Sequence, residues 1–141
     1  MKYYCPDPEL NQLYRERPDD AGFDICSAEE ITLEDNQWHL IRTALYVAIP
    51  SGHVGILKAR SGLSLKVNTD VHAGVLDPSY RGEVGVLISI EKPPFHIKKG
   101  ARIAQLIVYA CDTNPPIRVE CLEDLGETTR GAKGFGSTGG F

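Results

Sequence analysis

Glycine and proline interrupt this sequence at short intervals, and their frequency limits which secondary structures can form. The 141 residues include 14 glycines and nine prolines. The apolar runs between them, such as 44–49 and 84–90, are about four to eight residues long. Helices of ordinary length need longer stretches, whereas short runs rich in β-branched residues suit the strands of a sandwich or barrel. The sequence therefore predicts an all-β fold with a single helical turn at 61–66.

The apolar runs also locate the strands of this fold. We expect strands at 22–27, 38–41, 44–49, 54–58, 68–75, 84–90, 95–97, 103–111 and 117–120. Two turns, 50–52 and 77–79, contain a proline whose fixed φ angle suits the second position of a tight turn. We predict that each of these turns closes a hairpin.

Length and composition exclude several classes of protein. A chain of this length forms one domain with its own core. The net charge of −4 argues against a nucleic-acid-binding domain, which would carry a basic excess on one face. No apolar segment approaches the roughly 20 residues that span a bilayer, and the first residues resemble neither a secretory signal nor a transit peptide. We therefore expect a soluble intracellular protein, in the cytoplasm or nucleus, that binds neither nucleic acid nor membrane.

Cysteine and histidine spacing argues against a disulfide framework and against a zinc site. The four cysteines form no C-x-x-C pair, and the four histidines show no metal-binding spacing. We expect the cysteines to be reduced thiols, as is usual inside cells. On this acidic chain an anionic ligand would have to be held by a local cluster of cations.

The last residues, 130–141, contain five glycines and cannot build an element of the core. A frayed tail is one interpretation. A binding arm is the other, because Arg130, Ser137 and Thr138 could donate hydrogen bonds to phosphate oxygens alongside the exposed backbone N–H groups of the glycines. Phe135, between two glycines, could then stack on a nucleobase.

Three further positions could carry chemistry. Arg60, Ser61 and Gly62 combine a cation, a hydroxyl and an unhindered backbone at the start of the predicted helical turn, although Ser61 could be a simple N-cap. Asp77 follows a strand and could act as a general base toward water, or could only open a turn. Asp24 lies between apolar residues and could be functional or structural.

Five sequence blocks occur in order along the chain. They are AGFDI at 21–25, ARSGL at 59–63, AGVLDPSYRGE at 73–83, GARIAQL at 100–106 and RGAKGFGSTG at 130–139. In this order the blocks resemble the five motifs of the trimeric dUTP diphosphatases (dUTPases), and the resemblance covers essentially the whole chain.

The resemblance implies a jelly-roll-like β-barrel that forms a homotrimer with shared active sites. It implies a barrel domain over 1–125 and a flexible glycine-rich arm over 126–141 that closes an active site. The implied reaction is hydrolysis of dUTP to dUMP and pyrophosphate by attack of water on the α-phosphorus, assisted by Mg²⁺ that offsets the charge of the triphosphate. This activity would limit uracil incorporation into DNA and supply dUMP for dTMP synthesis.

Most candidate residues match family positions near the phosphates. Asp77 resembles the base that orients and deprotonates the attacking water. Asp24 resembles a carboxylate that contacts the metal indirectly, through water. The positions that match phosphate-binding or neighbouring substrate-binding residues are Arg60, Ser61, Gly62, Gln105, Arg130, Gly136, Ser137 and Thr138.

The remaining candidates match positions that contact the nucleoside. By this resemblance, backbone groups around Val71 and Gly74 pair with the uracil edge and leave no space for a 5-methyl group. Tyr80 packs under the deoxyribose, where a ribose 2′-hydroxyl would clash or lack a partner. Phe135 caps the uracil. Ser79 departs from the family pattern, which commonly has an acidic residue before the tyrosine.

Two other functions compete with this interpretation. A dCTP deaminase of the same superfamily would need a catalytic glutamate on the strand after the third block, where this chain has Leu87. A non-catalytic dUTPase-like regulatory binding protein would be expected to lack Asp77, Arg130 or Phe135, and all three are present. The sequence favours the enzyme and leaves a second, regulatory binding role open.

Overall fold

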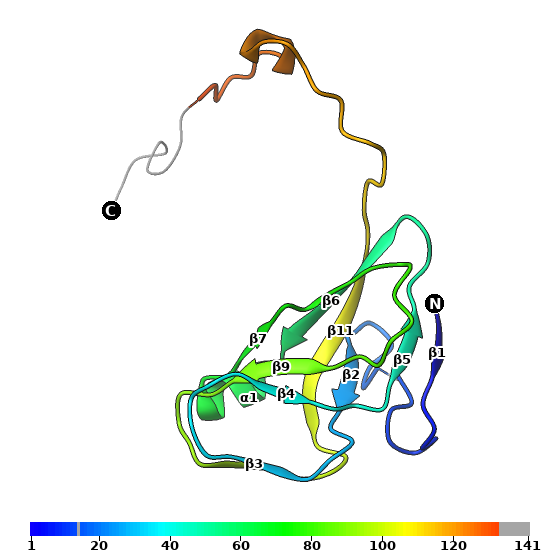
Figure 1. The fold of residues 1–141 in the computed structure, drawn as a ribbon, viewed down its shortest axis with the longest axis vertical. Coiled ribbons are helices and arrows are strands. Elements are labelled where there is room, and N and C mark those ends of the chain that lie inside the picture. The colour runs from blue at the N-terminus through cyan, green and yellow to red at the C-terminus, as the bar shows by residue number, and fades with distance from the viewer. Residues whose placement is uncertain (14, 133–141) are drawn as a thin grey trace.

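The computed structural model describes residues 1–13 and 15–132, which form short strands around one core, with a C-terminal segment that leaves it (Figure 1). The described helices are α1 (Ser61–Val67) and the 3-10 helix η1 (Leu122–Leu125). The all-β prediction with one short helix is therefore confirmed. The strands are β1 (Lys2–Tyr4), β2 (Phe23–Cys26), β3 (Ile31–Leu33), β4 (His39–Ile41), β5 (Tyr46–Ala48), β6 (His53–Ala59), β7 (Asp70–His72), β8 (Val75–Leu76), β9 (Val86–Ser89), β10 (Phe95–Ile97) and β11 (Arg102–Ala110).

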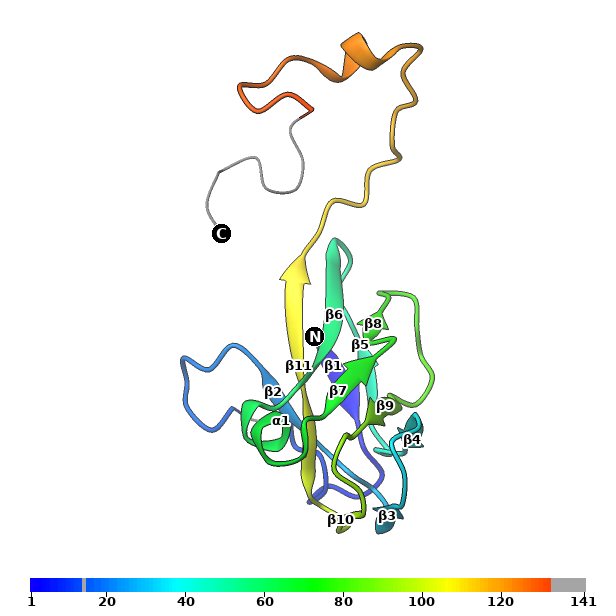
Figure 2. The ribbon, with the colours of Figure 1, turned by 90° about the vertical axis from the view of Figure 1, so that its left-hand side faces the viewer.

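The strands form four antiparallel sheets within the described residues. The largest has the order β2-β11-β6-β8, and a three-stranded sheet has the order β4-β9-β7. Two-stranded pairs, β1-β5 and β10-β3, are the remaining sheets, so the described strands form an open jelly-roll-like barrel that their hydrogen bonds do not close. Figure 2 shows β11 running along the molecule beside β6, with β2 on its other side. This long strand links the elements that carry the first, second and fourth sequence blocks.

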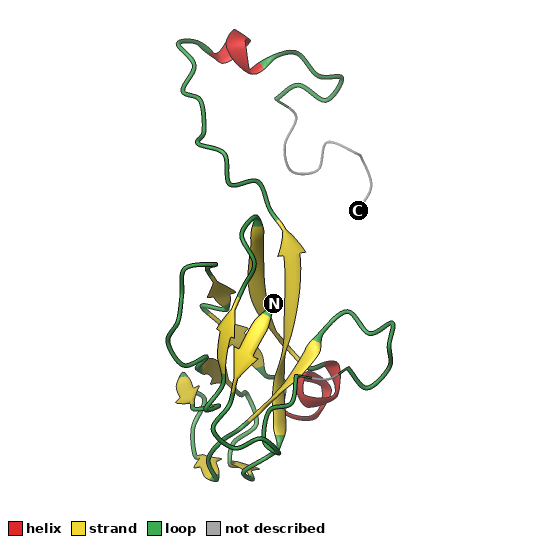
Figure 3. Ribbon diagram, turned by 90° about the vertical axis from the view of Figure 1, so that its right-hand side faces the viewer, coloured by secondary structure: helices red, strands yellow, loops and turns green. Residues whose placement is uncertain are grey.

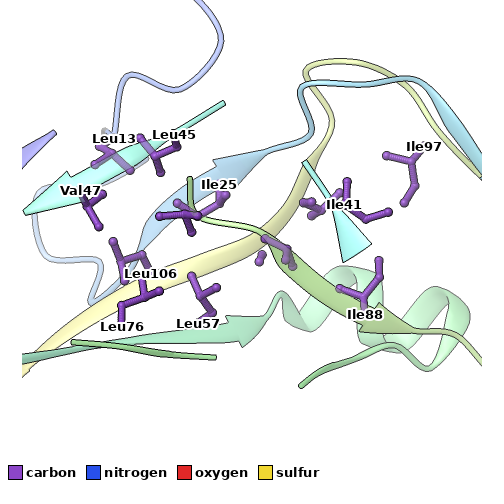
Figure 4. Close-up of a cluster of buried hydrophobic side chains, with 14 of the residues drawn as sticks. Leu13, Ile25, Ile41, Leu45, Val47, Leu57, Leu76, Ile88, Ile97 and Leu106 are labelled. Atoms are coloured by element: carbon purple, nitrogen blue, oxygen red, sulfur yellow. The ribbon is translucent and has the colours of Figure 1, made fainter. Parts of the chain in front are cut away.

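Alternating burial along the strands places one face of each sheet in a common core. In β9, Val86 and Ile88 are fully buried, whereas Leu87 and Ser89 on the other face are half-buried. Ile25 of β2 and Leu106 of β11, from the larger sheet, belong to the same buried cluster (Figure 4). Removal of this apolar surface from water supplies most of the driving force for folding.

Asn11 is a buried polar residue that ties three segments together. Its side-chain amide donates to the carbonyl oxygen of Thr43 at 2.7 Å and to that of Cys26 at 3.2 Å, while its oxygen accepts the Cys26 N–H at 2.7 Å. Asn11 is only 2% exposed. Since buried amides are costly unless they are hydrogen-bonded, these three bonds fix the N-terminal segment against β2.

Neither proline turn closes a hairpin, contrary to the prediction. The carbonyl oxygen of Pro50 accepts the N–H of His53 at 3.2 Å, but β5 pairs with β1 whereas β6 pairs with β11 and β8. The carbonyl oxygen of Asp77 accepts the N–H of Tyr80 at 3.1 Å, but β8 pairs with β6 whereas β9 pairs with β4 and β7. Turn residues reverse the chain, and packing of distant segments selects the strand partner.

Two strand predictions were wrong, and two strands were missed. The predicted strand 68–75 is two strands, because Ala73 has a positive φ of 48° that interrupts the extended backbone. The described backbone at 117–120 contains no strand. Strands β1 and β3 were not predicted, and each is only three residues long.

The chain leaves the barrel where β11 ends at Ala110. Residues 111–132 run outward as coil apart from η1 (Figure 3). Three large apolar side chains of this segment are open to solvent: Ile117, Leu122 and Leu125 are 90%, 76% and 69% exposed. No helix in the described part of the chain is long and apolar enough to cross a membrane.

Candidate functional site

The first, second and fourth sequence blocks meet at one pocket of about 390 Å³ between β2, α1 and β11. We call it the Arg60 pocket. It brings together Asp24, Arg60, Ser61, Gly62 and Gln105, five of the predicted site residues. Its other lining residues are Glu16, Asp20, Ala21, Gly22 and Arg102.

Asp24 is the centre of an ion-pair network in the Arg60 pocket. One carboxylate oxygen lies 2.8 Å from Nε of Arg60, and the other lies 3.1 Å from a terminal nitrogen of Arg102. The Asp24 side chain is 15% exposed. Two guanidinium groups held beside one pocket provide forked donors that suit phosphate or carboxylate oxygens.

Ser61 and Gly62 form the first turn of α1. The N-cap of α1 is Arg60, which has an extended backbone and makes no side-chain capping bond. Ser61 is the first helical residue, so its interpretation as an N-cap is wrong. Both Ser61 and Gly62 are exposed. Their hydroxyl and backbone N–H groups are therefore accessible from the Arg60 pocket.

Gln105 reaches the pocket because Gly22 leaves room for it. A Cβ atom on Gly22 would lie 2.6 Å from Oε1 of Gln105. The side-chain nitrogen of Gln105 donates to the carbonyl oxygen of Ala59 at 3.4 Å, which holds the amide between β2 and β6. Gly22 and Gln105 therefore fit together across the paired strands.

The third sequence block forms a second pocket, of about 310 Å³, which we call the Asp77 pocket. It is lined by Leu40, Ala73, Val75, Leu76, Asp77, Tyr80, Glu83 and Gly85. Asp77 follows β8 directly and is exposed. Tyr80 is 43% exposed, and its hydroxyl donates to the carbonyl oxygen of Glu83 at 2.8 Å. An exposed carboxylate beside an anchored aromatic ring can act on a flat ligand that stacks there.

Glu83 anchors the loop that carries Asp77 and Tyr80. One oxygen of Glu83 accepts the N–H groups of Thr43 at 3.1 Å and Ala44 at 2.8 Å, and the other accepts two bonds from Arg42 at 3.0 and 3.3 Å. Partial burial raises the pKa of Glu83, but the hydrogen bonds from Arg42 and the two backbone N–H groups outweigh it, so the pKa lies below its ordinary value.

Val71 and Gly74 lie in the part of the third block that precedes Asp77. Val71 belongs to β7, where it pairs with Ile88 and packs against the core. The carbonyl oxygen of Gly74 accepts the N–H of Leu57 at 2.7 Å, and a Cβ atom on Gly74 would lie 2.8 Å from the Leu57 carbonyl oxygen. The Gly74 carbonyl is therefore already bonded to β6, and only a residue without a side chain fits there.

The predicted site residues are not all brought together in one chain. The Arg60 pocket and the Asp77 pocket share no lining residue, and α1 and β8 lie on opposite sides of the barrel in Figure 2. Arg130 is exposed in the segment beyond η1. Four predicted positions lie outside the described residues: Phe135, Gly136, Ser137 and Thr138.

Arg102 and Glu16 line the Arg60 pocket but were not among the predicted site residues. Arg102 and Gln105 are three apart on β11 and would point to opposite faces of a regular strand. A register shift between Arg102 and Ala104 brings both to the same pocket. The fourth block, which begins just before Arg102, was the available signal. Glu16 lies in a polar loop that no motif marks.

Comparisons with known proteins agree on one family. Residues 9–139 match the family model described as dUTPase. The chain is 44% identical over 120 residues to the deoxyuridine 5'-triphosphate nucleotidohydrolase of Mus musculus, covering 84% of this chain and 72% of that protein.

Solved structures give the same result. The chain resembles the Staphylococcus bacteriophage 80alpha dUTPase with dUpNHpp, with a TM-score of 0.85 and 31% identity over 98% of this chain and 97% of that one. It also resembles a mutant dUTPase from phage phi11 of S. aureus, whose structure reveals the coordination of a structural Mg(II) ion. Here the TM-score is 0.78, with 27% identity over 86% of this chain and 97% of that one.

Proposed function

This chain belongs to the dUTPase family, and from that premise we propose that it hydrolyses dUTP to dUMP and pyrophosphate with a water molecule oriented by Asp77. The match over residues 9–139, which includes all five sequence blocks, carries this assignment. In the proposed step water adds to the α-phosphorus, the α–β anhydride bond breaks, and pyrophosphate leaves. Asp77 accepts the proton of the attacking water, a role that suits an exposed carboxylate lining a pocket.

The Arg60 pocket is the proposed site for the phosphates. Arg60, Arg102 and Gln105 contribute donors, and Ser61 and Gly62 add a hydroxyl and backbone N–H groups. On the family pattern, Arg130, Gly136, Ser137 and Thr138 complete the phosphate contacts from the C-terminal arm, 126–141.

The residues of the Arg60 pocket fit a metal ion only through water. Among the described residues no group of three histidine, cysteine or acidic side chains could hold a metal ion directly. Both carboxylate oxygens of Asp24 are engaged by arginines. Asp24 would therefore contact the metal indirectly, by accepting a hydrogen bond from a water molecule bound to the metal. When bound, Mg²⁺ would offset the negative charge of the triphosphate. The phage phi11 dUTPase is a relative described with a Mg(II) ion.

The Asp77 pocket is the proposed site for the nucleoside. Tyr80 would support the deoxyribose, and its hydroxyl bond to the backbone of Glu83 keeps the ring in place. Backbone groups near Val71 and Gly74 would read the uracil edge, and Phe135 would cover the base. Of these groups the Gly74 carbonyl is engaged by Leu57, which leaves the other backbone groups of this segment as the candidates for base pairing.

We propose that the active enzyme is a homotrimer with shared active sites. The supporting observation is that one chain presents the phosphate donors and Asp77 in separate pockets. A second copy that brings its Asp77 pocket against the Arg60 pocket of the first would complete the site. An intracellular location is proposed from the nucleotide substrate and from the four cysteines, all free thiols.

A product assay tests the function. dUTP, dTTP, dCTP and UTP are supplied separately with Mg²⁺, and the products are resolved by chromatography for the native protein and for Asp77→Asn. We expect conversion of dUTP alone to dUMP and pyrophosphate, with a loss in kcat of at least about 100-fold in the variant. Release of ammonia from dCTP, or tight dUTP binding without turnover, would contradict the assignment.

A further inference from the structure

Arg102 is shared by two carboxylates that differ in exposure. The same terminal nitrogen of Arg102 lies 3.0 Å from Oε2 of Glu16 and 3.1 Å from Oδ2 of Asp24. The Asp24 side chain is 15% exposed and is also bonded to Arg60, whereas the Glu16 side chain is 65% exposed. Exposed ion pairs are weak because water and salt screen them, whereas an inner pair with two partners is harder to break. Glu16 is therefore the carboxylate that Arg102 releases more readily.

The loop that carries Glu16 is anchored on both sides of it. The guanidinium of Arg15 lies 4.4 Å from the centre of the Phe23 ring, next to Asp24 on β2. The N–H of Arg17 donates to Oδ2 of Asp20 at 2.9 Å, and the N–H of Asp20 donates back to the Arg17 carbonyl oxygen at 3.1 Å. The Arg15 contact ties the loop to β2, and the Arg17–Asp20 bonds close a turn directly after Glu16, so a change of side-chain rotamer is enough for Glu16 to leave Arg102.

The charges around the Arg60 pocket oppose the entry of an anion while Glu16 stays in place. Two described arginines, Arg60 and Arg102, line the pocket, and three carboxylates, Asp24, Glu16 and Asp20, line it with them. A triphosphate brings close to four negative charges into this pocket. Rotation of Glu16 into solvent removes one repulsive charge from the pocket lining, and phosphate oxygens can take the place of the Glu16 carboxylate at Arg102.

We propose that Glu16 is a displaceable counter-ion of Arg102 that competes with the polyphosphate for the Arg60 pocket. It neutralises Arg102 while the pocket is empty, moves aside when the polyphosphate binds, and returns as the polyphosphate leaves. Glu16 thereby weakens polyphosphate binding and hastens its release. The identity of the ligand rests on the proposed function, whereas the competition at Arg102 rests on the two ion pairs.

Binding of inorganic pyrophosphate to the assembled full-length protein tests this proposal without requiring hydrolysis. Titration calorimetry with Mg²⁺ compares the native protein, Glu16→Gln and the matched control Glu34→Gln. Glu34 follows β3, is exposed and is not part of the Arg60 pocket, so its replacement makes the same change in net charge elsewhere. We expect Glu16→Gln to tighten pyrophosphate binding about two- to fivefold at low salt, and Glu34→Gln to leave it within experimental error.

The salt dependence and the kinetics supply independent readouts. The difference between Glu16→Gln and native protein should shrink as salt is raised, and the variant should have a lower KM for dUTP. Unchanged or weaker pyrophosphate binding in Glu16→Gln would overturn the proposal, weaker binding indicating that Glu16 helps to hold the metal-bound ligand. If native protein fails to hydrolyse dUTP, the proposed function fails, and the calorimetry still decides the role of Glu16.

Discussion

At the scale of single residues, the site depends on local deviations from regular strand geometry. Arg102 and Gln105 share a pocket only because the pairing of β11 with β2 shifts register between them. Such a bulge leaves no signature in the alternation of apolar and polar residues, so Arg102 could not be placed beside Gln105 by counting along a strand. Asp24, Ser61 and Gln105 were singled out because each lies in a motif that is recognisable in the sequence, and the structure brings all three to one pocket.

Substitution of Gly22 should displace the side chain of Gln105. In Gly22→Ala the new Cβ would approach Oε1 of Gln105 to 2.6 Å, so the flexible end of the glutamine must move away. Because the clash is mainly with the end of a side chain, we expect the melting temperature to fall by no more than about 3 °C. The KM for dUTP should rise about two- to tenfold, as a displaced hydrogen-bond donor would cause. A large fall in melting temperature with an unchanged KM would show that Gly22 serves folding alone.

For helices and strands, the sequence predicts the local backbone conformation better than it predicts which strand pairs with which. Strand β10 and helix α1 lie almost where they were predicted, because apolar runs and turn residues act over a few neighbouring positions. Strands β1 and β3 were missed since each is stabilised by pairing with a strand far along the chain, β5 and β10 respectively. The two expected hairpins failed for the same reason.

The Glu83 anchor gives a pH-dependent prediction for the loop between β8 and β9. The pKa of Glu83 is lower in the folded protein than its ordinary value of 4.5, so its ionised form stabilises the fold. Native protein should exceed Glu83→Gln in unfolding free energy by about 1–3 kcal/mol above pH 5. This difference should disappear as the pH falls below 4.5 through the lowered pKa, because native Glu83 then becomes neutral like glutamine.

Thermal unfolding of native protein, Glu83→Gln and the exposed control Glu34→Gln between pH 3 and 7 measures this difference. The difference between the native and variant curves cancels the pH dependence that other carboxylates give to both proteins. Asp7 beside Lys99 and Asp35 beside the N–H of Gln37 are examples, because hydrogen bonds lower the pKa of each. A constant gap between native protein and Glu83→Gln across this pH range would contradict a stabilising charge on Glu83.

In the whole molecule, the two pockets that we propose to form one active site are separate within a single chain. The proposed phosphate donors line the Arg60 pocket beside α1, whereas Asp77 follows β8, which lies apart from α1 (Figure 2). The segment 111–132 leaves the barrel with exposed apolar side chains such as Ile117 and Leu122. Neither feature could be predicted from apolar periodicity, which describes how a chain buries its own core.

Mixing two inactive variants tests whether the Arg60 pocket of one subunit and the Asp77 pocket of another form one active site. Asp77→Asn lacks the proposed base but keeps the Arg60 pocket, and Arg60→Gln lacks a phosphate donor but keeps the Asp77 pocket. If each active site takes these pockets from different subunits, equal mixing and reassembly should restore about one quarter of the native activity, because about one site in four then combines two intact pockets. Each variant alone should stay nearly inactive, and light scattering should give three times 15.5 kDa for every species. If the mixture stays inactive although mixed trimers form, each chain must complete its active site alone. A movement within the subunit would then have to bring the Arg60 pocket and the Asp77 pocket together.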